Sequence, residues 1–275
     1  MTTSVLELLR CPVCGAPGRA EQQGRVFACL GPRRHCFDFS RSGYLNLCPS
    51  GKAGSGDARE AVRARSAFLE AGYYRPLSDA VNGLLDELGA VRVLDAGCGE
   101  GYYTNRMAPG RVVLGADLSR PGIDHAAKTA KRTGSGAGFV IAGLFALPVR
   151  DAALDAVVSL FAPCAGQEFA RVLRPGGYLI LAGAGERHLL GLKRVLYDLP
   201  YLNPGREDLP RQLEPVRREQ LLDTVTVRGS EQIAALFSMT PYYWRTSAAD
   251  RARLDRLDEL ETEIQFDIFV YRKGH

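Results

Sequence analysis

The 275-residue sequence predicts an α/β fold, a doubly wound sheet preceded by a small cysteine-rich module. Two observations predict the sheet. Apolar strand segments alternate with helical segments from about residue 90 to residue 182, and a glycine-rich loop follows the first of these strands. A third observation predicts the module, because five of the seven cysteines lie within the first 48 residues. Hydrophobic residues make up 46% of the chain, which is enough for a sizeable core.

The amino-terminal cysteines are spaced as ligands of one metal ion. Cys11 and Cys14 form a C-x2-C pair, Cys29 follows after 14 further residues, and His35 and Cys36 compete for a fourth position. Sulfur and imidazole ligands at these separations suit tetrahedral zinc, and so small a module needs a metal in order to fold. A redox-active C-x-x-C pair is the alternative, but no βαβ unit precedes residue 48. The spacing therefore predicts a zinc-ribbon-like module.

A linker and two helices connect this module to the sheet. Residues 49–56, PSGKAGSG, have the composition of a flexible linker. Asp57 is placed to cap a helix that runs to Leu69, and a second helix is expected over residues 77–88. We therefore expect three parts in the chain, at residues 1–48, 49–89 and 90–275.

The loop after the first strand has the features of a ligand site. The strand ends in Asp95, and Gly97, Gly99 and Gly101 follow in a G-x-G-x-G pattern that lets the backbone turn tightly and approach a ligand. The pattern differs from the dinucleotide fingerprint, and no Gly-Lys-Ser/Thr follows, so a ligand without a pyrophosphate is favoured. The next strand ends in Asp117, which is placed to accept ribose hydroxyls. Helix or turn capping is the alternative role of either acid.

The remaining segments complete the alternation and then become less regular. Further strands are expected at 112–117, 138–142, 154–161 and 178–182, with helices at 120–131 and 168–173. Beyond the sheet we expect a helix at 186–199, an inserted loop region at 202–220, helices at 230–237 and 248–260, and a final strand at 263–271.

The glycine loop and the two acids resemble the S-adenosylmethionine site of class I (Rossmann-like) methyltransferases, over about residues 90–185. A narrower resemblance covers nearly the whole chain. It is to the bacterial 23S rRNA guanine-N1 methyltransferases of the RlmA family, which includes macrolide-resistance members. Besides the cysteine–histidine module, the segments that carry it are GYLNL at 43–47, FLEAG at 68–72, YRPL at 74–77, DAGCGEGYYT at 95–104, FAPC at 161–164, RHL at 187–189 and MTP at 239–241.

The resemblance implies a methyltransferase domain over residues 90–275 and a zinc module that helps to recognise a guanine in an RNA stem-loop. It also implies that Cys11, Cys14, Cys29 and His35 hold the zinc, although the gap before His35 is longer than is usual in the family. The cofactor-binding residues that the motifs and the resemblance together predict are Tyr74, Asp95, Gly97, Gly99, Gly101, Tyr103, Thr104, Asp117 and His188.

Few residues of the sequence can be assigned a role in methyl transfer to guanine N1. The reaction is an in-line displacement, so positioning dominates, and the N1 proton must leave. The N1 edge is hidden in a duplex, so the base must be unpaired or flipped. Phe161 is a candidate to stack on the base, and His188 is a candidate base or cofactor contact. Core packing is the alternative role of each, and the sequence assigns no general base.

The charge distribution agrees with an RNA partner. The net charge is +4, and residues 1–75 alone carry 11 Lys+Arg against 6 Asp+Glu. Such a surplus favours a polyanion, here 23S rRNA, although 30 of the 35 basic residues are Arg and a GC-rich genome would also produce that bias. The sequence shows no secretory signal and no apolar run of membrane-spanning length, so we expect a cytoplasmic location. Whether the chain forms a homodimer stays open.

Two other functions compete with RNA methylation. One is a natural-product methyltransferase that keeps the zinc module as a scaffold, and the other is a non-catalytic RNA-binding protein. The glycine loop with both acids argues against the second. Within the leading hypothesis, resistance to macrolides is a further expectation that the sequence leaves open.

Overall fold

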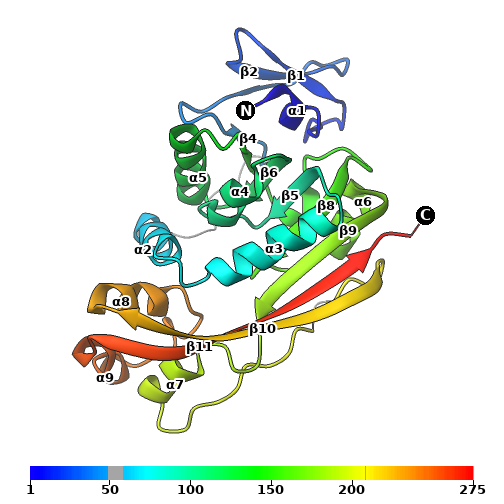
Figure 1. Cartoon of the computed structure of the whole chain (residues 1–275). Coiled ribbons are helices and arrows are strands. Elements are labelled where there is room, and N and C mark those ends of the chain that lie inside the picture. Colours follow the sequence, from blue (N-terminus) through cyan, green and yellow to red (C-terminus); the bar gives the residue numbers. More distant parts are fainter. Residues whose placement is uncertain (49–57, 208, 275) are drawn as a thin grey trace.

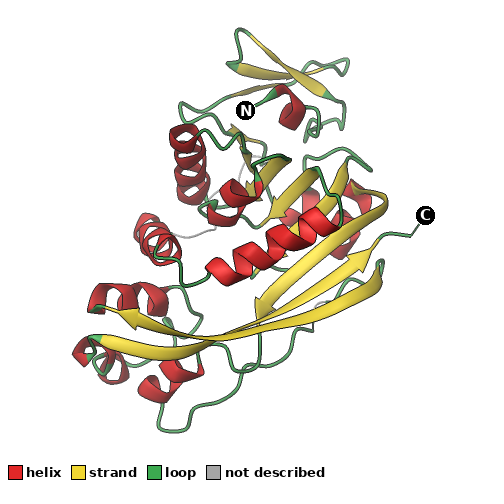
Figure 2. Cartoon of the chain, in the orientation of Figure 1, coloured by secondary structure: helices red, strands yellow, loops and turns green. Residues whose placement is uncertain are grey.

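A computed structural model describes residues 1–48, 58–207 and 209–274. Within them, eight strands form one mixed sheet in the order β10-β11-β9-β8-β5-β6-β7-β4 (Figures 1 and 2). This sheet confirms the predicted α/β class I architecture. Its parallel centre consists of β5 (Arg92–Ala96), β6 (Val112–Asp117), β7 (Gly138–Ile141), β8 (Leu154–Leu160) and β9 (Leu173–Ala184).

Alternate residues of each central strand face two different covers, as the pleat requires. Val93 and Val113 pack in one apolar cluster with the connecting helices, and Leu94 and Leu114 pack in a second cluster on the other face. The helices of the first cover are α2 (Arg59–Glu70), α3 (Arg75–Glu87), α4 (Tyr102–Met107) and α5 (Arg120–Thr133). The second cluster combines α6 (Gly166–Val172) with the amino-terminal module.

The amino-terminal module is a three-stranded antiparallel sheet attached to the main sheet. It contains α1 (Thr3–Leu6), β1 (Gly18–Glu21), β2 (Val26–Cys29) and β3 (Cys36–Asp38). The next strand, β4 (Leu45–Asn46), leaves the module and pairs in parallel with β7. The expected linker at 49–56 and the capping residue Asp57 lie outside the described residues. Helix α2 begins after Ala58, whose side chain makes no capping hydrogen bond.

The carboxyl-terminal third differs most from the prediction. The expected loop at 202–220 is wrong from Glu214 onward, because β10 (Glu214–Arg228) starts there and pairs along its length with β11 (Glu259–Arg272). The expected helix at 248–260 is also wrong beyond Arg251, since α9 (Ala248–Arg251) and a 3-10 turn (Leu254–Arg256) give way to β11. Helix α7 (Leu190–Leu196), shorter than expected, precedes β10, and α8 (Ser230–Ser238) lies between β10 and β11 in the chain.

The predicted helix is cut short because the chain from Glu259 onward pairs with β10 in the sheet. The predicted loop is wrong because β10 is an edge strand. Most of its residues are exposed on both faces, so it lacks the apolar alternation that identifies a strand in a sequence. Its partner β11 supplies the hydrogen bonds instead. No helix among the described residues is long and apolar enough to cross a membrane.

Candidate functional site

The structure brings four of the predicted metal ligands together in the amino-terminal module. The ligand atoms of Cys11, Cys14, Cys29 and His35 all lie within 4.8 Å of one another. The Cys14 and Cys29 sulfurs are 3.8 Å apart. Two sulfurs at the zinc distance of ~2.3 Å in a tetrahedron are also about 3.8 Å apart, so the set fits this metal. The thiol of Cys36 lies outside this set, 3.6 Å from the carbonyl oxygen of Arg34.

Local backbone geometry shapes this cluster. The Cys11 N–H donates to the carbonyl of Ala16, and Gly15 takes a left-handed φ of 73° that reverses the chain after the C-x2-C pair. Burial would raise the pKa of Cys29, but hydrogen bonds from the backbone of Gly31 and His35 outweigh it and lower that pKa to about 7. A thiol with a lowered pKa is readily deprotonated, and the thiolate is the form that binds metal.

The glycine loop lies at the carboxyl ends of β5 and β6 and leaves no room for larger residues. Gly97, Gly99 and Gly101 all have positive φ. A Cβ on Gly97 would lie 2.5 Å from the Cβ of Ala162, and one on Gly101 would lie 2.5 Å from the Cβ of Ala126. The loop therefore packs closely against Ala162 and Ala126, and only glycine at these positions allows this turn and this approach.

The two predicted acids flank this loop and are held differently. Asp95 is buried and accepts a 2.6 Å hydrogen bond from Thr104 Oγ1, and burial raises the pKa of Asp95 to about 7. Asp117 accepts one backbone hydrogen bond from Gly99 (3.0 Å) and one from Ser119 (2.7 Å). Each oxygen of Asp117 keeps a further lone pair for a ligand hydroxyl.

The buried hydroxyl of Tyr103 is independent evidence that a ligand binds at this site. This hydroxyl has no hydrogen-bond partner in the described part of the chain. A buried hydroxyl without a partner is costly, and a bound polar ligand removes the cost. Tyr103 and Thr104 stand side by side at the start of α4, directly after the glycine loop. This unpartnered hydroxyl and the adjacent glycine loop fit a nucleoside-type cofactor.

Tyr74 and His188 form a buried pair that packs against Phe161. Gln265 N–H donates to His188 Nδ1 (3.2 Å), so the ring proton is on Nε2, which donates to Tyr74 Oη (3.0 Å). Burial lowers the pKa of His188 to about 3, which keeps the ring neutral. Both ring nitrogens are thus occupied, and the Tyr74 hydroxyl hydrogen is directed away from His188.

Phe161 stands at the end of β8 with a strained backbone. Its φ is 56°, a left-handed value that a bulky residue rarely adopts, and its side chain is 47% exposed. The ring stacks near Tyr74, with centroids 6.2 Å apart and planes inclined by 26°. Strain at an exposed aromatic residue is typical of a functional position.

The role of two residues at this site could not be predicted from the sequence. Gln265 acts through its backbone and sits in β11, far from the motifs. Arg206 donates to the carbonyl of Ala162 at 2.9 Å and so supports the chain next to Phe161. It belongs to a segment that the sequence indicates only as a loop, without any motif.

The aromatic run at 242–244 has both buried and exposed members. Tyr242 is buried and its hydroxyl donates to Asn203, and Tyr243 packs against Phe237. Trp244 is 86% exposed.

Comparison with known proteins places these sites in one family. The chain is 32% identical over 94% of its length to a Micromonospora griseorubida protein assigned as a 23S rRNA (guanine-N(1)-)-methyltransferase, with 95% of that protein covered. It is 31% identical to the 23S rRNA (guanine(748)-N(1))-methyltransferase of Streptomyces fradiae, over 98% of both chains. The chain belongs to the 23S rRNA (guanine-N1)-methyltransferase family.

A third relative and two family models agree with this family. A Bacillus subtilis member, assigned as the methyltransferase YxjB, is 30% identical over 97% of each chain. Residues 9–55 match the family model of the RlmA amino-terminal zinc ribbon, and residues 93–177 match that of a methyltransferase domain. Among solved structures, the YcgJ protein of Bacillus subtilis aligns with 70% of this chain and 98% of its own, at 16% identity and a TM-score of 0.48. The cofactors of this family member are S-adenosylmethionine and Zn2+.

Proposed function

We propose that this chain transfers the methyl group of S-adenosylmethionine to N1 of a guanine in a stem-loop of 23S rRNA. The observation that carries the proposal is full-length similarity to relatives named for that reaction, in a chain whose two sites are both intact. A small-molecule methyltransferase would not explain why similarity extends through the zinc ribbon.

Cys11, Cys14, Cys29 and His35 would hold the zinc. Because protein ligands take all four tetrahedral positions, the metal has no open site for substrate and its role is structural. The ribbon would then act as a rigid support for RNA contacts.

The glycine loop with its flanking acids would hold the cofactor, which supplies the electrophilic methyl group. Gly97, Gly99 and Gly101 would shape the turn on which it lies, and Asp117 would accept its ribose hydroxyls through the remaining lone pairs. Tyr103 would gain a partner for its buried hydroxyl, and Asp95 with Thr104 would fix the start of α4. These contacts position the methyl group rather than activate it.

The end of β8 would receive the target base. Phe161 offers an exposed ring on which an unpaired guanine can stack. His188 would be a positioning residue, because both of its nitrogens are occupied and its pKa of about 3 leaves it neutral. It orients the Tyr74 hydroxyl hydrogen toward a bound ligand. A donor aimed at guanine O6 would stabilise the charge that develops as N1 loses its proton.

The test is methyl transfer from labelled cofactor to 23S rRNA taken from cells that lack this gene. We expect incorporation into one guanine, located by mass spectrometry of nuclease digests, and loss of Watson–Crick pairing at that base. No incorporation into any ribosomal RNA would refute the proposal. A cytoplasmic location follows from such a substrate, and measuring the mass of the protein in solution decides between monomer and homodimer. Drug-sensitivity testing of an expressing strain decides the question of macrolide resistance.

A further inference from the structure

A separate hollow lies at the same edge of the sheet as the cofactor loop. It has a volume of about 340 Å3, within the range of ligand sites. Its walls come from the 3-10 turn η1 (Leu144–Ala146), from residues 164–168 and from residues 209–212. The first wall follows β7 and the second follows β8, so both belong to the carboxyl ends of the parallel strands. None of the glycine-loop residues lines it.

The hollow is nevertheless adjacent to the reaction site. Leu144, the first residue of η1, borders the cofactor loop, because a Cβ on Gly97 would lie 3.8 Å from its Cδ1 atom. Cys164 in the second wall follows Phe161 by three residues. A ligand in the hollow would therefore be a neighbour of the target base rather than the target base itself.

The side chains of the hollow match the chemistry of a nucleotide. Phe145 is 72% exposed, an unusual state for a large aromatic ring. Arg211 is exposed, and Gln167 and Gln212 add amide groups. Unpaired bases stack on aromatic rings and are read along their edges by hydrogen-bonding groups, and guanidinium groups bind phosphates.

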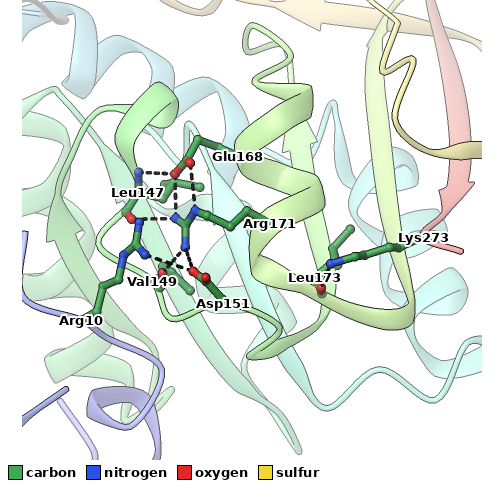
Figure 3. A network of polar contacts seen from close by, with 8 residues as sticks. All are labelled: Arg10, Leu147, Val149, Asp151, Glu168, Arg171, Leu173 and Lys273. Carbon is green, nitrogen blue, oxygen red and sulfur yellow. Dashed lines mark hydrogen bonds and ion pairs between the residues drawn. The ribbon is translucent and has the colours of Figure 1, made fainter. Parts of the chain in front are cut away.

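Among the described residues that line the hollow, the one acidic side chain, that of Glu168, is neutralised (Figure 3). Glu168 accepts a hydrogen bond from the backbone N–H of Leu147 at 2.9 Å and two from Arg171, at 2.9 Å and 2.7 Å. Its charge is therefore balanced inside the wall and does not repel a phosphate. The same contacts fix the wall, so the hollow is formed before a ligand arrives.

This network continues into the zinc ribbon. Arg171 pairs with Asp151, which also pairs with Arg10 at 3.0 Å, and the Arg10 N–H donates to the carbonyl of Pro148. Figure 3 shows these side chains as one continuous set of contacts. The ribbon and the wall of the hollow are thus in direct contact, so an RNA that contacts the ribbon near Arg10 also passes close to the hollow.

We propose that this hollow binds an unpaired nucleotide that neighbours the target guanine, with its base stacked on Phe145 and its phosphate on Arg211. The inference rests on the proposed function, because it assigns one more subsite to the same RNA. Its role is to hold the loop of the RNA open and in register while the target guanine occupies the site at Phe161.

The test compares Phe145→Ala with Phe145→Trp and with Leu222→Ala, a control that removes an exposed apolar side chain from β10. Base stacking predicts that Phe145→Ala weakens binding of the RNA stem-loop roughly 5- to 150-fold. Phe145→Trp and Leu222→Ala are expected to bind it like the wild type, and all variants are expected to bind S-adenosylmethionine equally. Arg211→Gln is expected to flatten the salt dependence of RNA binding, by a slope of roughly 0.7 for one single-strand phosphate contact.

A direct readout places 2-aminopurine at each unpaired position around the target guanine. One position is expected to be quenched on binding, and Phe145→Ala alone is expected to restore its fluorescence. Unchanged RNA binding by Phe145→Ala overturns the inference, and so does an equal loss of S-adenosylmethionine binding, which would assign the hollow to the cofactor. A wild-type protein that methylates no ribosomal RNA refutes the proposed function instead, and the two failures are therefore distinguishable.

Discussion

Removal of zinc is expected to destabilise the whole chain, because the ribbon covers one face of the central sheet. Seven buried apolar side chains belong to the ribbon and its connections: Val5, Leu6, Leu8, Leu9, Phe27, Leu45 and Leu47. They pack against sheet residues such as Leu94, Leu114 and Val140. The ribbon is too small to stay folded without its metal, so zinc loss would expose both sides of this contact.

The size of this effect follows from burial. At about 1.5–3 kcal/mol for each fully buried side chain, the seven together contribute on the order of 10–20 kcal/mol. Typical domains have a total stability of about 5–15 kcal/mol. The conformational entropy that the unfolded ribbon regains offsets part of this contribution, and the remainder is expected to lower the stability of the sheet markedly.

Calorimetry with and without a chelator measures the effect. We expect one cooperative unfolding transition in the zinc-loaded protein, a large downward shift of that transition after chelation, and a parallel loss of S-adenosylmethionine binding. Cys29→Ser should act like the chelator, whereas Cys36→Ser, whose sulfur lies outside the ligand cluster, should not. Two separate transitions, with the sheet unfolding at the same temperature with or without zinc, would refute this reasoning.

Three further predictions concern the cofactor edge of the sheet. Gly97→Ala should reduce S-adenosylmethionine affinity at least tenfold in titration calorimetry, because the added Cβ meets Ala162 at 2.5 Å and left-handed backbone costs about 1–2 kcal/mol; unchanged affinity would contradict it. His188 has a folded pKa of about 3 against an ordinary 6.5, so its contribution to stability is complete above pH 6.5 and is lost as the pH falls toward 3. Denaturant titrations should therefore show a shallower loss of stability over that interval in His188→Gln, and parallel curves would refute this. Phe161→Gly should be about 1 kcal/mol more stable than Phe161→Ala, because both variants lose the ring contacts with Tyr74 but only glycine relieves the left-handed φ, and methyl transfer should fall in both; equal stability of the two variants would refute the strain.

The metal and cofactor sites could be predicted from the sequence where their residues lie close together in the chain. The C-x2-C pair with Cys29 and His35 depends on local turns and one hairpin, and the strand, glycine loop and helix from Asp95 to Thr104 form one continuous unit. In such segments, residue type and spacing almost determine the geometry, because few backbone conformations satisfy both.

The fourth zinc ligand could not be predicted from residue type and spacing alone. His35 and Cys36 are neighbours, and the sequence left both open. Hydrogen bonding between β2 and β3 decides between them: the His35 N–H donates to Cys29 Sγ at 3.1 Å, while Cys36 pairs with Ala28 in the strand and keeps its thiol exposed.

The other features of the fold and of the sites depend on contacts between residues that are far apart in the chain. By itself the sequence determined the alternating sheet, the metal-ligand spacing and the cofactor loop, because these depend on periodicity and short turns. Only the tertiary structure made an edge strand of β10, set the tautomer of His188 through Gln265 and formed the hollow around Phe145. Each of these joins residues far apart in the chain, and no local propensity specifies which distant strand or loop supplies the partner.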